Sequence, residues 1–425
     1  MNATIDHLRR LPSELRKNEV WRRVDFEQFL VDELQPAERQ SECRIDLHCN
    51  VPNLNTTRLL FWNGYYYNAL QHLPNGIIYG SLREARQQHP DLMAEMSVTN
   101  PYSTINAEGY TDGLFLFIPD NVDVELPIQL QSVIDSDHPV LIQTRNYVHV
   151  GQGSRLSLIL CDDSGNDDRS FSNNVTQLHV GSHAHVQLYK MQNLNDHSAL
   201  LNQTFVEMQE GASLLSMAFT FNGGNIRNHT EIRMQGEHCT TEAHGLYLLD
   251  KEQHADNYVF VDHAKPNCNS QELYKGIMDD SSSAVFNGHV LVEDGATKTE
   301  AYQTNRNILL TDKASIDTKP FLEIYNDDVK CSHGSTTGQL DDKALFYLRS
   351  RGISEHIART LLLAAFCDEV TQKVEIPALR DWLGDICNRR LHGEFSPCSD
   401  CYLNCSTTGG CEKMKLDFHL DTSKL

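Results

Sequence analysis

The chain has no long hydrophobic segment and comparatively few basic residues. The longest apolar runs, such as LLLAAF at 361–366, are far short of the roughly 20 residues that a membrane-spanning helix needs. The polar N-terminus predicts no secretory signal. The 425 residues include 36 Lys and Arg against 58 Asp and Glu, which gives a formal charge of -22. Because such a surface repels nucleic acid and anionic lipid, we expect a cytoplasmic protein without nucleic-acid or membrane partners.

Motifs of several common enzyme classes are also missing. The segment GSTTGQ at 334–339 contains glycines, but it lacks the Lys-Ser/Thr pair that holds phosphates and magnesium in a phosphate-binding loop. The sequence has no G-x-S-x-G elbow, no H-E-x-x-H helix and no dinucleotide fingerprint. We therefore expect that the chain does not hydrolyse nucleotides itself.

From about residue 110 to 330 the sequence alternates between apolar and polar residues, which is typical of β-strands. A turn residue, a small residue and an alternating strand recur, and the first three repeats start 28 and 30 residues apart. They begin at Gly153, Gly181, Gly211, Ser281 and Lys313. Repetition at this period is typical of stacked β-coils, in which each coil buries its inner face on its neighbours. An antiparallel sandwich also fits the alternation.

Helical patterns flank this β region. Residues 1–105 form a mainly helical region, with three- and four-residue apolar spacing in 8–34 and 81–96 and an aromatic, Asn-Gly-punctuated hairpin at 63–80. The β core spans 106–333. A helical domain at 334–392 and a cysteine-rich tail at 393–425 follow.

The helical domain has clear boundary residues. Gly352 ends a first helix, Ser354 caps a second, and a third follows Pro377. Three amphipathic helices form only a thin core, so they must pack on the β region, on a partner, or on both.

Cys331 and His333 are the most specific candidate site. In an extended strand, residues of equal parity share a face, so the two side chains point the same way. A thiolate and an imidazole together bind soft or borderline metals, or they act as a nucleophile and its base. Two ligands do not complete a tetrahedral site. A packed cysteine beside a histidine at the end of a strand, without function, fits the same pattern.

Other cysteines and histidines form two further groups. One, between 238 and 268, has irregular spacing that suits polar side chains on the outer face of successive β-coils better than a metal site. Its members are His238, Cys239, His244, His254, His263 and Cys268. The tail contains Cys398, Cys401, Cys405 and Cys411. Two interpretations fit so many cysteines in a short segment. The tail binds zinc or an iron–sulfur cluster, or it is a redox-labile end without structure.

The segment YNDDVKCSHGSTTGQLDDKALFYLRSRGI, Tyr325 to Ile353, closely resembles the signature of the SufB/SufD family, which belongs to the bacterial SUF iron–sulfur cluster assembly machine. Gly334 follows His333, which is similar to the SufD branch, because SufB-like chains usually carry a glutamate there. The resemblance implies a fold that is mainly β with α: a central right-handed parallel β-helix flanked by N-terminal and C-terminal helical regions. The cysteine-rich tail is not part of the shared signature.

The resemblance also implies a function, that of a non-catalytic scaffold subunit in an ATP-dependent assembly complex. Such subunits pair with a SufB-like subunit through the β-helix, or with a second copy when isolated, and bind a SufC-like ATPase through the C-terminal helices. A transient iron–sulfur cluster forms at the SufB interface, where His333 acts with Cys331 beside it, and the isolated chain binds no cofactor stably. The ATPase contact is assigned to Leu345, Leu348, Leu361, Leu362 and Phe366.

Two alternatives belong to other functional classes. A metal-dependent lyase or hydrolase on a β-helix needs paired carboxylates on adjacent coils, whereas the β region offers dispersed acids such as Glu207, Glu231 and Asp262. The second alternative is an interaction module that zinc in its tail stabilises.

Overall fold

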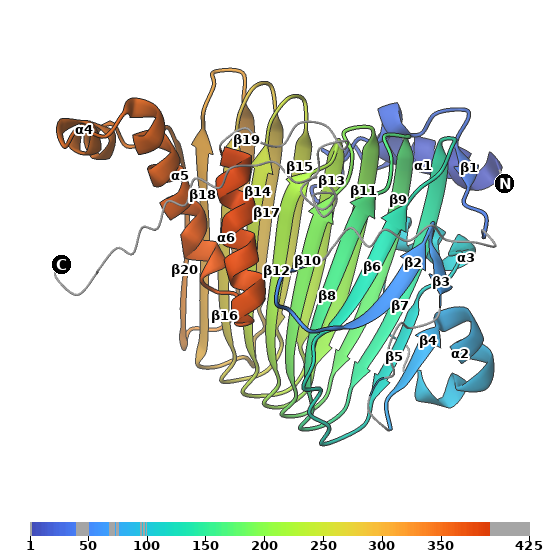
Figure 1. Cartoon of the computed structure of the whole chain (residues 1–425). Helices are drawn as coiled ribbons and strands as arrows, with labels where there is room; N and C mark the ends of the chain where they lie inside the picture. Colours follow the sequence, from blue (N-terminus) through green and yellow to red (C-terminus); the bar gives the residue numbers. More distant parts are fainter. Residues whose placement is uncertain are drawn as a thin grey trace.

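The β region of the computed structural model consists of two sheets of mainly parallel strands, and successive strands along the chain belong alternately to one sheet and the other (Figure 1). The structure describes residues 2–39, 51–67, 73, 76–93, 96, 98 and 100–391. One sheet has the order β19-β17-β15-β13-β11-β9-β7-β5-β4, with β1 beside β7, and the other has the order β20-β18-β16-β14-β12-β10-β8-β6-β2-β3. Because sheet neighbours are mostly two elements apart in sequence, the chain changes sheet at each turn. The predicted parallel β-helix is confirmed, and the sandwich is excluded.

Each coil of the β-helix adds one parallel strand to each sheet, and only the pairs β2–β3 and β4–β5 are antiparallel in the described residues. The first sheet contains β1 (Gln35–Pro36), β4 (Ile78–Ser81), β5 (Leu114–Ile118), β7 (Val140–Val150), β9 (Ser170–Val180), β11 (Ser198–Met208), β13 (Asn225–Met234), β15 (His254–His263), β17 (Ser283–Val292) and β19 (Ser315–Ile324). The second contains β2 (Thr57–Trp62), β3 (Tyr65–Tyr67), β6 (Ile128–Ile134), β8 (Arg155–Ser164), β10 (His185–Asn193), β12 (Ser213–Asn222), β14 (Thr240–Leu249), β16 (Asn269–Met278), β18 (Thr299–Leu309) and β20 (Val329–Gly338).

One corner of the β-helix has the same backbone geometry in every coil from β6 to β18. A residue with φ between 57° and 66° precedes each strand of the second sheet, and this left-handed conformation turns the chain sharply. These residues are Asn121, Gly153, His183, Gly211, His238, Asn267 and Lys298. Two of the predicted repeat starts are among them, so the repeat of 28 and 30 residues is one coil of two strands.

The interior of the β-helix has an apolar part and a polar part. Leu156, Val186 and Leu214 are partners in successive strands of the second sheet and belong to the apolar part. In the polar part, the buried Lys190 ammonium donates to the hydroxyls of Thr204 and Thr230, both at 3.2 Å. Burial lowers the pKa of Lys190 to about 8.

The N-terminal region covers the outer face of the first sheet. It contains α1 (Asn2–Glu14), η1 (Glu27–Phe29), α2 (Leu82–Gln88), η2 (Pro90–Leu92) and α3 (Pro101–Gly109). The helical prediction for 8–34 holds only as far as Glu14. Beyond it, tertiary contacts decide the path, because Trp21 stacks on His229 at 4.8 Å and the Val20 carbonyl accepts a hydrogen bond from Arg227. The helix α3 had no counterpart in the prediction.

The prediction of a hairpin within 63–80 is wrong, because β3 and β4 lie in different sheets. Strands β2 and β3 pair antiparallel around Asn63 and Gly64, and β2 also pairs in parallel with β6. The second sheet therefore begins well before the predicted boundary at 106.

Three helices complete the described chain: α4 (Asp342–Ser350), α5 (Glu355–Thr371) and α6 (Pro377–Leu391). The Ser354 side chain accepts from the Ile357 N–H, and Gly352 adopts φ +87°, as predicted for a cap and a helix end. Buried residues of α5 and α6 pack on the second sheet, whereas α4 projects away from it (Figure 1). Because β20 continues to Gly338, the helical part begins at Asp342 rather than at 334. No helix in the described residues is long and apolar enough to span a membrane.

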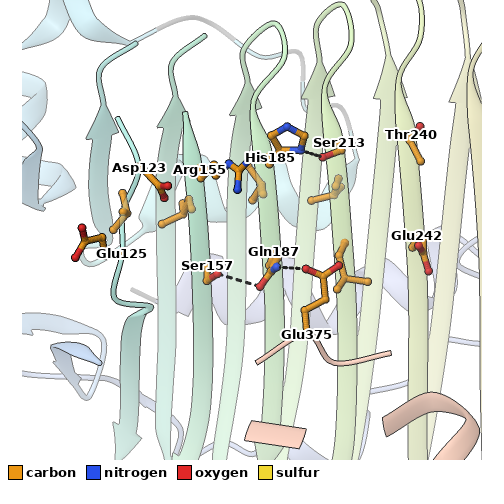
Figure 2. A pocket seen from close by; sticks show the side chains of 15 residues that line it. Asp123, Glu125, Arg155, Ser157, His185, Gln187, Ser213, Thr240, Glu242 and Glu375 are labelled. Atoms are coloured by element: carbon orange, nitrogen blue, oxygen red, sulfur yellow. Dashed lines mark hydrogen bonds between the residues drawn. The ribbon is translucent and has the colours of Figure 1, made fainter. Parts of the chain in front are cut away.

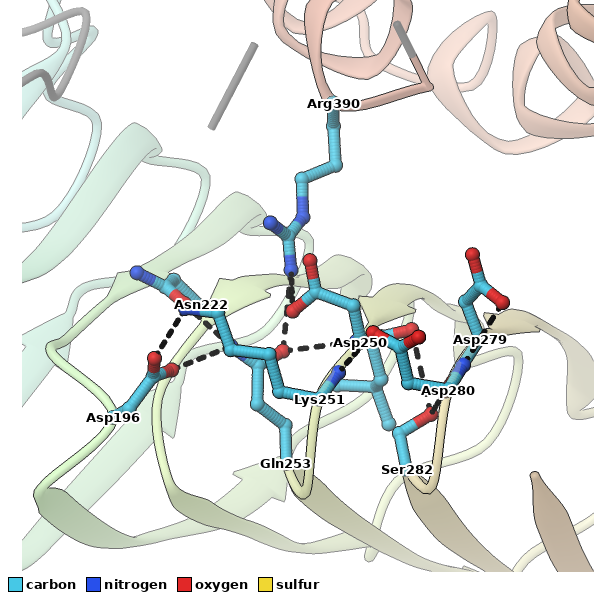
Figure 3. A network of polar contacts seen from close by, with 10 residues as sticks. Asp196, Asn222, Asp250, Lys251, Gln253, Asp279, Asp280, Ser282 and Arg390 are labelled. Carbon is cyan, nitrogen blue, oxygen red and sulfur yellow. Dashed lines mark hydrogen bonds and ion pairs between the residues drawn. The ribbon is translucent and has the colours of Figure 1, made fainter. Parts of the chain in front are cut away.

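A polar network anchors the end of α6 to a corner of the β-helix (Figure 3). The Arg390 guanidinium donates to Gln253 Oε1 at 3.2 Å and pairs with Asp250 at 2.8 Å. Gln253 in turn donates to Asp196, which also pairs with Lys251. The helical part is therefore held by charge-assisted bonds as well as by apolar packing.

We expect the N-terminal cover to depend on the ion pair of Arg227 and Asp256, which are partners in β13 and β15 and almost fully buried. Arg227→Met leaves a buried carboxylate unpaired, which costs about 3–5 kcal/mol in the free energy of unfolding by urea. Arg23→Met is the matched control, because its pair with Asp317 is half exposed and contributes at most about 1 kcal/mol. Equal losses from the two substitutions would contradict this assignment.

Candidate functional site at the open end of the β-helix

Strands β19 and β20 form the last coil of the β-helix. Each pairs on one side with the preceding strand of its sheet, and no strand in the described part of the chain pairs with the other side. No residue of either strand is fully buried. A sheet edge of this kind exposes unpaired N–H and C=O groups, which form a template for pairing with another chain.

His333 and Cys331 belong to the inward-facing rows of this last coil. Their partners in β18 are Gln303 and Ala301, which are both buried inside the β-helix. Side chains at paired positions of parallel strands point to the same face. Both residues therefore share the inner face, as their parity predicts. His333 is exposed, because its row ends at the open end.

The Cys331 side chain is half buried against an apolar cluster that includes Leu322, Val292 and Ala301. Burial raises the pKa of its thiol, so the neutral form predominates at neutral pH. A nucleophilic cysteine needs the opposite shift. The half-buried, neutral thiol therefore lacks the activation that a catalytic cysteine has.

Large apolar side chains surround the open end. Four of them are between 39% and 58% exposed: Tyr302, Phe321, Ile324 and Tyr325. Sequence reasoning did not single them out, although FLEIY at 321–325 has apolar residues at both parities, which a strand buried on one face does not need. Apolar side chains beside unpaired edges are typical of a protein interface.

The five residues assigned to an ATPase contact lie in different environments. Leu345 is buried, Leu361 is exposed, and the remaining three are half buried. Phe366 serves the chain's own fold, because its carbonyl accepts from Lys275 at 2.9 Å and its ring lies 4.1 Å from the same ammonium. The more exposed apolar residues here are Phe346 at 74% and Tyr347 at 56%, and neither is among the five assigned residues.

The other cysteine and histidine groups do not form a site in the described residues. No cluster of three or more His, Cys, Asp or Glu side chains there is arranged to hold a metal ion. Cys239, Cys268 and His263 are fully buried inside the β-helix, so the outer-face interpretation is wrong for them. The tail cysteines Cys398, Cys401, Cys405 and Cys411 lie outside the described residues.

A groove of about 580 Å³ crosses the outer face of the second sheet (Figure 2). Its polar side chains bond to one another: Ser157 donates to Gln187, which donates to Glu375. The hydrogen bond from His244 holds the pKa of Glu242 at about 2, so this carboxylate is not a proton donor at neutral pH. Glu242 therefore does not act as the general acid that a lyase or hydrolase in this groove would need.

We expect the alkylation of Cys331 to follow its raised pKa. With iodoacetamide, the midpoint of rate against pH lies higher in the native chain than in urea, where the thiol has its usual pKa of about 8.5. Mass spectrometry of the peptide that contains Cys331 measures both rates, and Cys331→Ser removes the signal. Simple shielding lowers the native rate without moving the midpoint, and that outcome would contradict the assignment.

Comparisons with known proteins agree with this architecture. The family described as "SUF system FeS cluster assembly, SufBD core domain" matches residues 132–366, and "SufBD protein N-terminal region" matches residues 2–130. The iron-sulfur cluster assembly protein SufD of Escherichia coli (strain K12) is 31% identical over 390 residues, which is 89% of each chain. An iron-sulfur cluster assembly SufBD family protein of Synechocystis is 29% identical over 87% of this chain and 85% of its own. The chloroplastic protein ABCI7 of Arabidopsis thaliana is 27% identical over 89% and 83%. The chain therefore belongs to the SufBD family of iron–sulfur cluster assembly proteins.

Proposed function

We propose that this chain is a non-catalytic, cytoplasmic scaffold subunit that builds iron–sulfur clusters at its interface with a SufB-like partner. The observation that carries the proposal is the placement of His333 and Cys331 on the inner face of an edge strand that no described strand pairs on its outer side. Relatives over most of the chain are named as iron-sulfur cluster assembly proteins. The cluster is cargo in this proposal, and the chain holds it only transiently.

The open end suits pairing through strands. A partner with a similar β-helix extends both sheets by hydrogen bonding to β19 and β20 and covers the apolar side chains around them. A second copy of this chain occupies the same edges when the partner is absent. Either partner satisfies backbone groups that the chain leaves unpaired.

The ligand set is half of a site. Iron in a cluster is held by thiolates and, in some centres, by imidazoles. This chain contributes one thiol and one imidazole, and no larger group of metal ligands occurs in its described residues. The remaining ligands come from the partner, so a cluster forms only in the complex. Any metal in the cysteine-rich tail is separate from this site.

The helix α4 supplies a second docking surface, which we assign to a SufC-like ATPase. Phe346 and Tyr347 project from it into solvent, and Ile357 and Leu361 are exposed on α5. The chain has no phosphate-binding loop, so ATP-driven motion must come from a separate subunit.

We expect His333→Ala to reduce cluster yield at least tenfold while the complex still assembles, because removing a ligand of a metal site typically costs on the order of 10-fold or more. Visible absorbance and acid-labile sulfide of the reconstituted complex measure the yield, and gel filtration measures its assembly. His185→Ala is the matched control, because His185 is exposed in the groove of Figure 2. Full cluster formation by His333→Ala would falsify the assigned role. Loss of yield in His185→Ala would instead favour the groove.

We expect Phe346→Asp to weaken binding of the ATPase subunit by about 2 kcal/mol, or roughly 30-fold in Kd, because a charge replaces an aromatic anchor. Binding of the SufB-like subunit stays unchanged. Leu126→Asp is the control, since Leu126 is 46% exposed and lies outside the helical part. Calorimetric titration measures both affinities. Unchanged ATPase affinity in Phe346→Asp excludes α4 as the docking surface.

A further inference from the structure

A buried polar row leads directly to His333. Glu272 in β16, Gln303 in β18 and His333 in β20 are partners in successive strands. Glu272 and Gln303 are each only 2% exposed, whereas His333 stands at the uncovered end of the row. Strands in a sheet are about 4.8 Å apart, so the Gln303 side chain is the neighbour of His333 in this row.

The hydrogen bonding of this row is incomplete on the side of His333. Gln303 Nε2 donates to Glu272 Oε2 at 2.8 Å, which turns the nitrogen toward β16. The oxygen of the same amide takes no part in that bond. Gln303 Oε1 is buried and has no hydrogen-bond partner in the described residues. An unsatisfied buried acceptor costs about 1–3 kcal/mol.

The surroundings hold the Gln303 carboxamide in place. A Cβ on Gly288 of the facing sheet would lie 2.1 Å from Gln303 Nε2 and 2.6 Å from its Cδ. The amide therefore occupies space that only a glycine leaves open. Burial raises the pKa of Glu272 to about 8, so its carboxyl is neutral at neutral pH and needs no counter-ion.

We infer that Gln303, held by Glu272, is a positioning residue for His333: when the exposed imidazole turns toward β18, the free Oε1 of Gln303 accepts a hydrogen bond from one ring N–H, and the other ring nitrogen is left unprotonated and directed to the open end. Histidines that bind metals usually donate their second N–H to a carbonyl or carboxylate in this way, which selects the tautomer and the ring orientation. The inference rests on the proposed function, since it specifies how His333 is presented to iron of the nascent cluster.

The test is Gln303→Met, which keeps the side-chain length but removes the acceptor. In the chain labelled with ¹⁵N-histidine, the His333 signal is the one that His333→Ala removes. We expect a single neutral tautomer in the unsubstituted chain and a mixture in Gln303→Met. Cluster yield of the reconstituted complex falls on the order of 10-fold. Gln192→Met is the matched control, because Gln192 is also buried in the interior and bonds Asn228, yet lies several coils from His333. It should leave the tautomer and the yield unchanged.

Gly288→Ala gives a second test that alters neither Gln303 nor His333. The added methyl displaces the Gln303 amide, so the same tautomer mixture is expected. An unchanged tautomer in both Gln303→Met and Gly288→Ala overturns the positioning role, even when His333→Ala abolishes cluster formation and the proposed function stands. Full cluster yield in His333→Ala overturns the proposed function, whichever tautomer the imidazole adopts.

Discussion

The parallel hydrogen-bond ladder between coils is the constraint on which the rest of this structure depends. A strand in the β-helix satisfies its backbone N–H and C=O groups on both sides only when a coil lies on each side of it. This condition holds from β6 to β18 and ends at β19 and β20. The unpaired edges, the exposed apolar side chains and the candidate ligands therefore occur together, because the stacking of coils ends at β19 and β20.

The same stacking gives the site its geometry. Since each side chain lies over its partner in the next coil, an inward-facing row continues unchanged in direction from the buried interior to the open end. His333 and Cys331 terminate two such rows, one polar and one apolar. A rigid strand with a packed interior behind it presents a ligand more accurately than a loop does. The thiol of Cys331 is half buried next to the apolar row that contains Ala301, whereas the exposed imidazole of His333 follows the polar row that contains Gln303.

Some apolar residues of the helical part pack on the second sheet, and others are exposed on α4. The buried faces of α5 and α6 complete the second sheet, and Lys275 reaches from β16 to the end of α5, where it bonds Glu369 and the Phe366 carbonyl. The helix α4 is left outside this packing (Figure 1). Only residues 339–341 separate it from β20. The two proposed docking surfaces, the edge at β20 and the helix α4, are therefore joined by a short segment of chain. This arrangement suits the proposed scaffold, in which a bound ATPase affects the other interface.

The sequence by itself determined the strand alternation and the repeat of the β region, the three C-terminal helices with the caps at Ser354 and Gly352, and the placement of Cys331 and His333 on one face. These features depend on local periodicity and turn chemistry, which a single chain contains. The order of strands in the two sheets is what excludes the sandwich. Only the tertiary structure decided the path after Glu14, which follows Trp21 and Arg227 onto the first sheet, and the exposure of Phe346 as opposed to Leu345. It also decided that Gln303 and Glu272 stand behind His333, because residues about thirty positions apart become neighbours only when the register between coils is set.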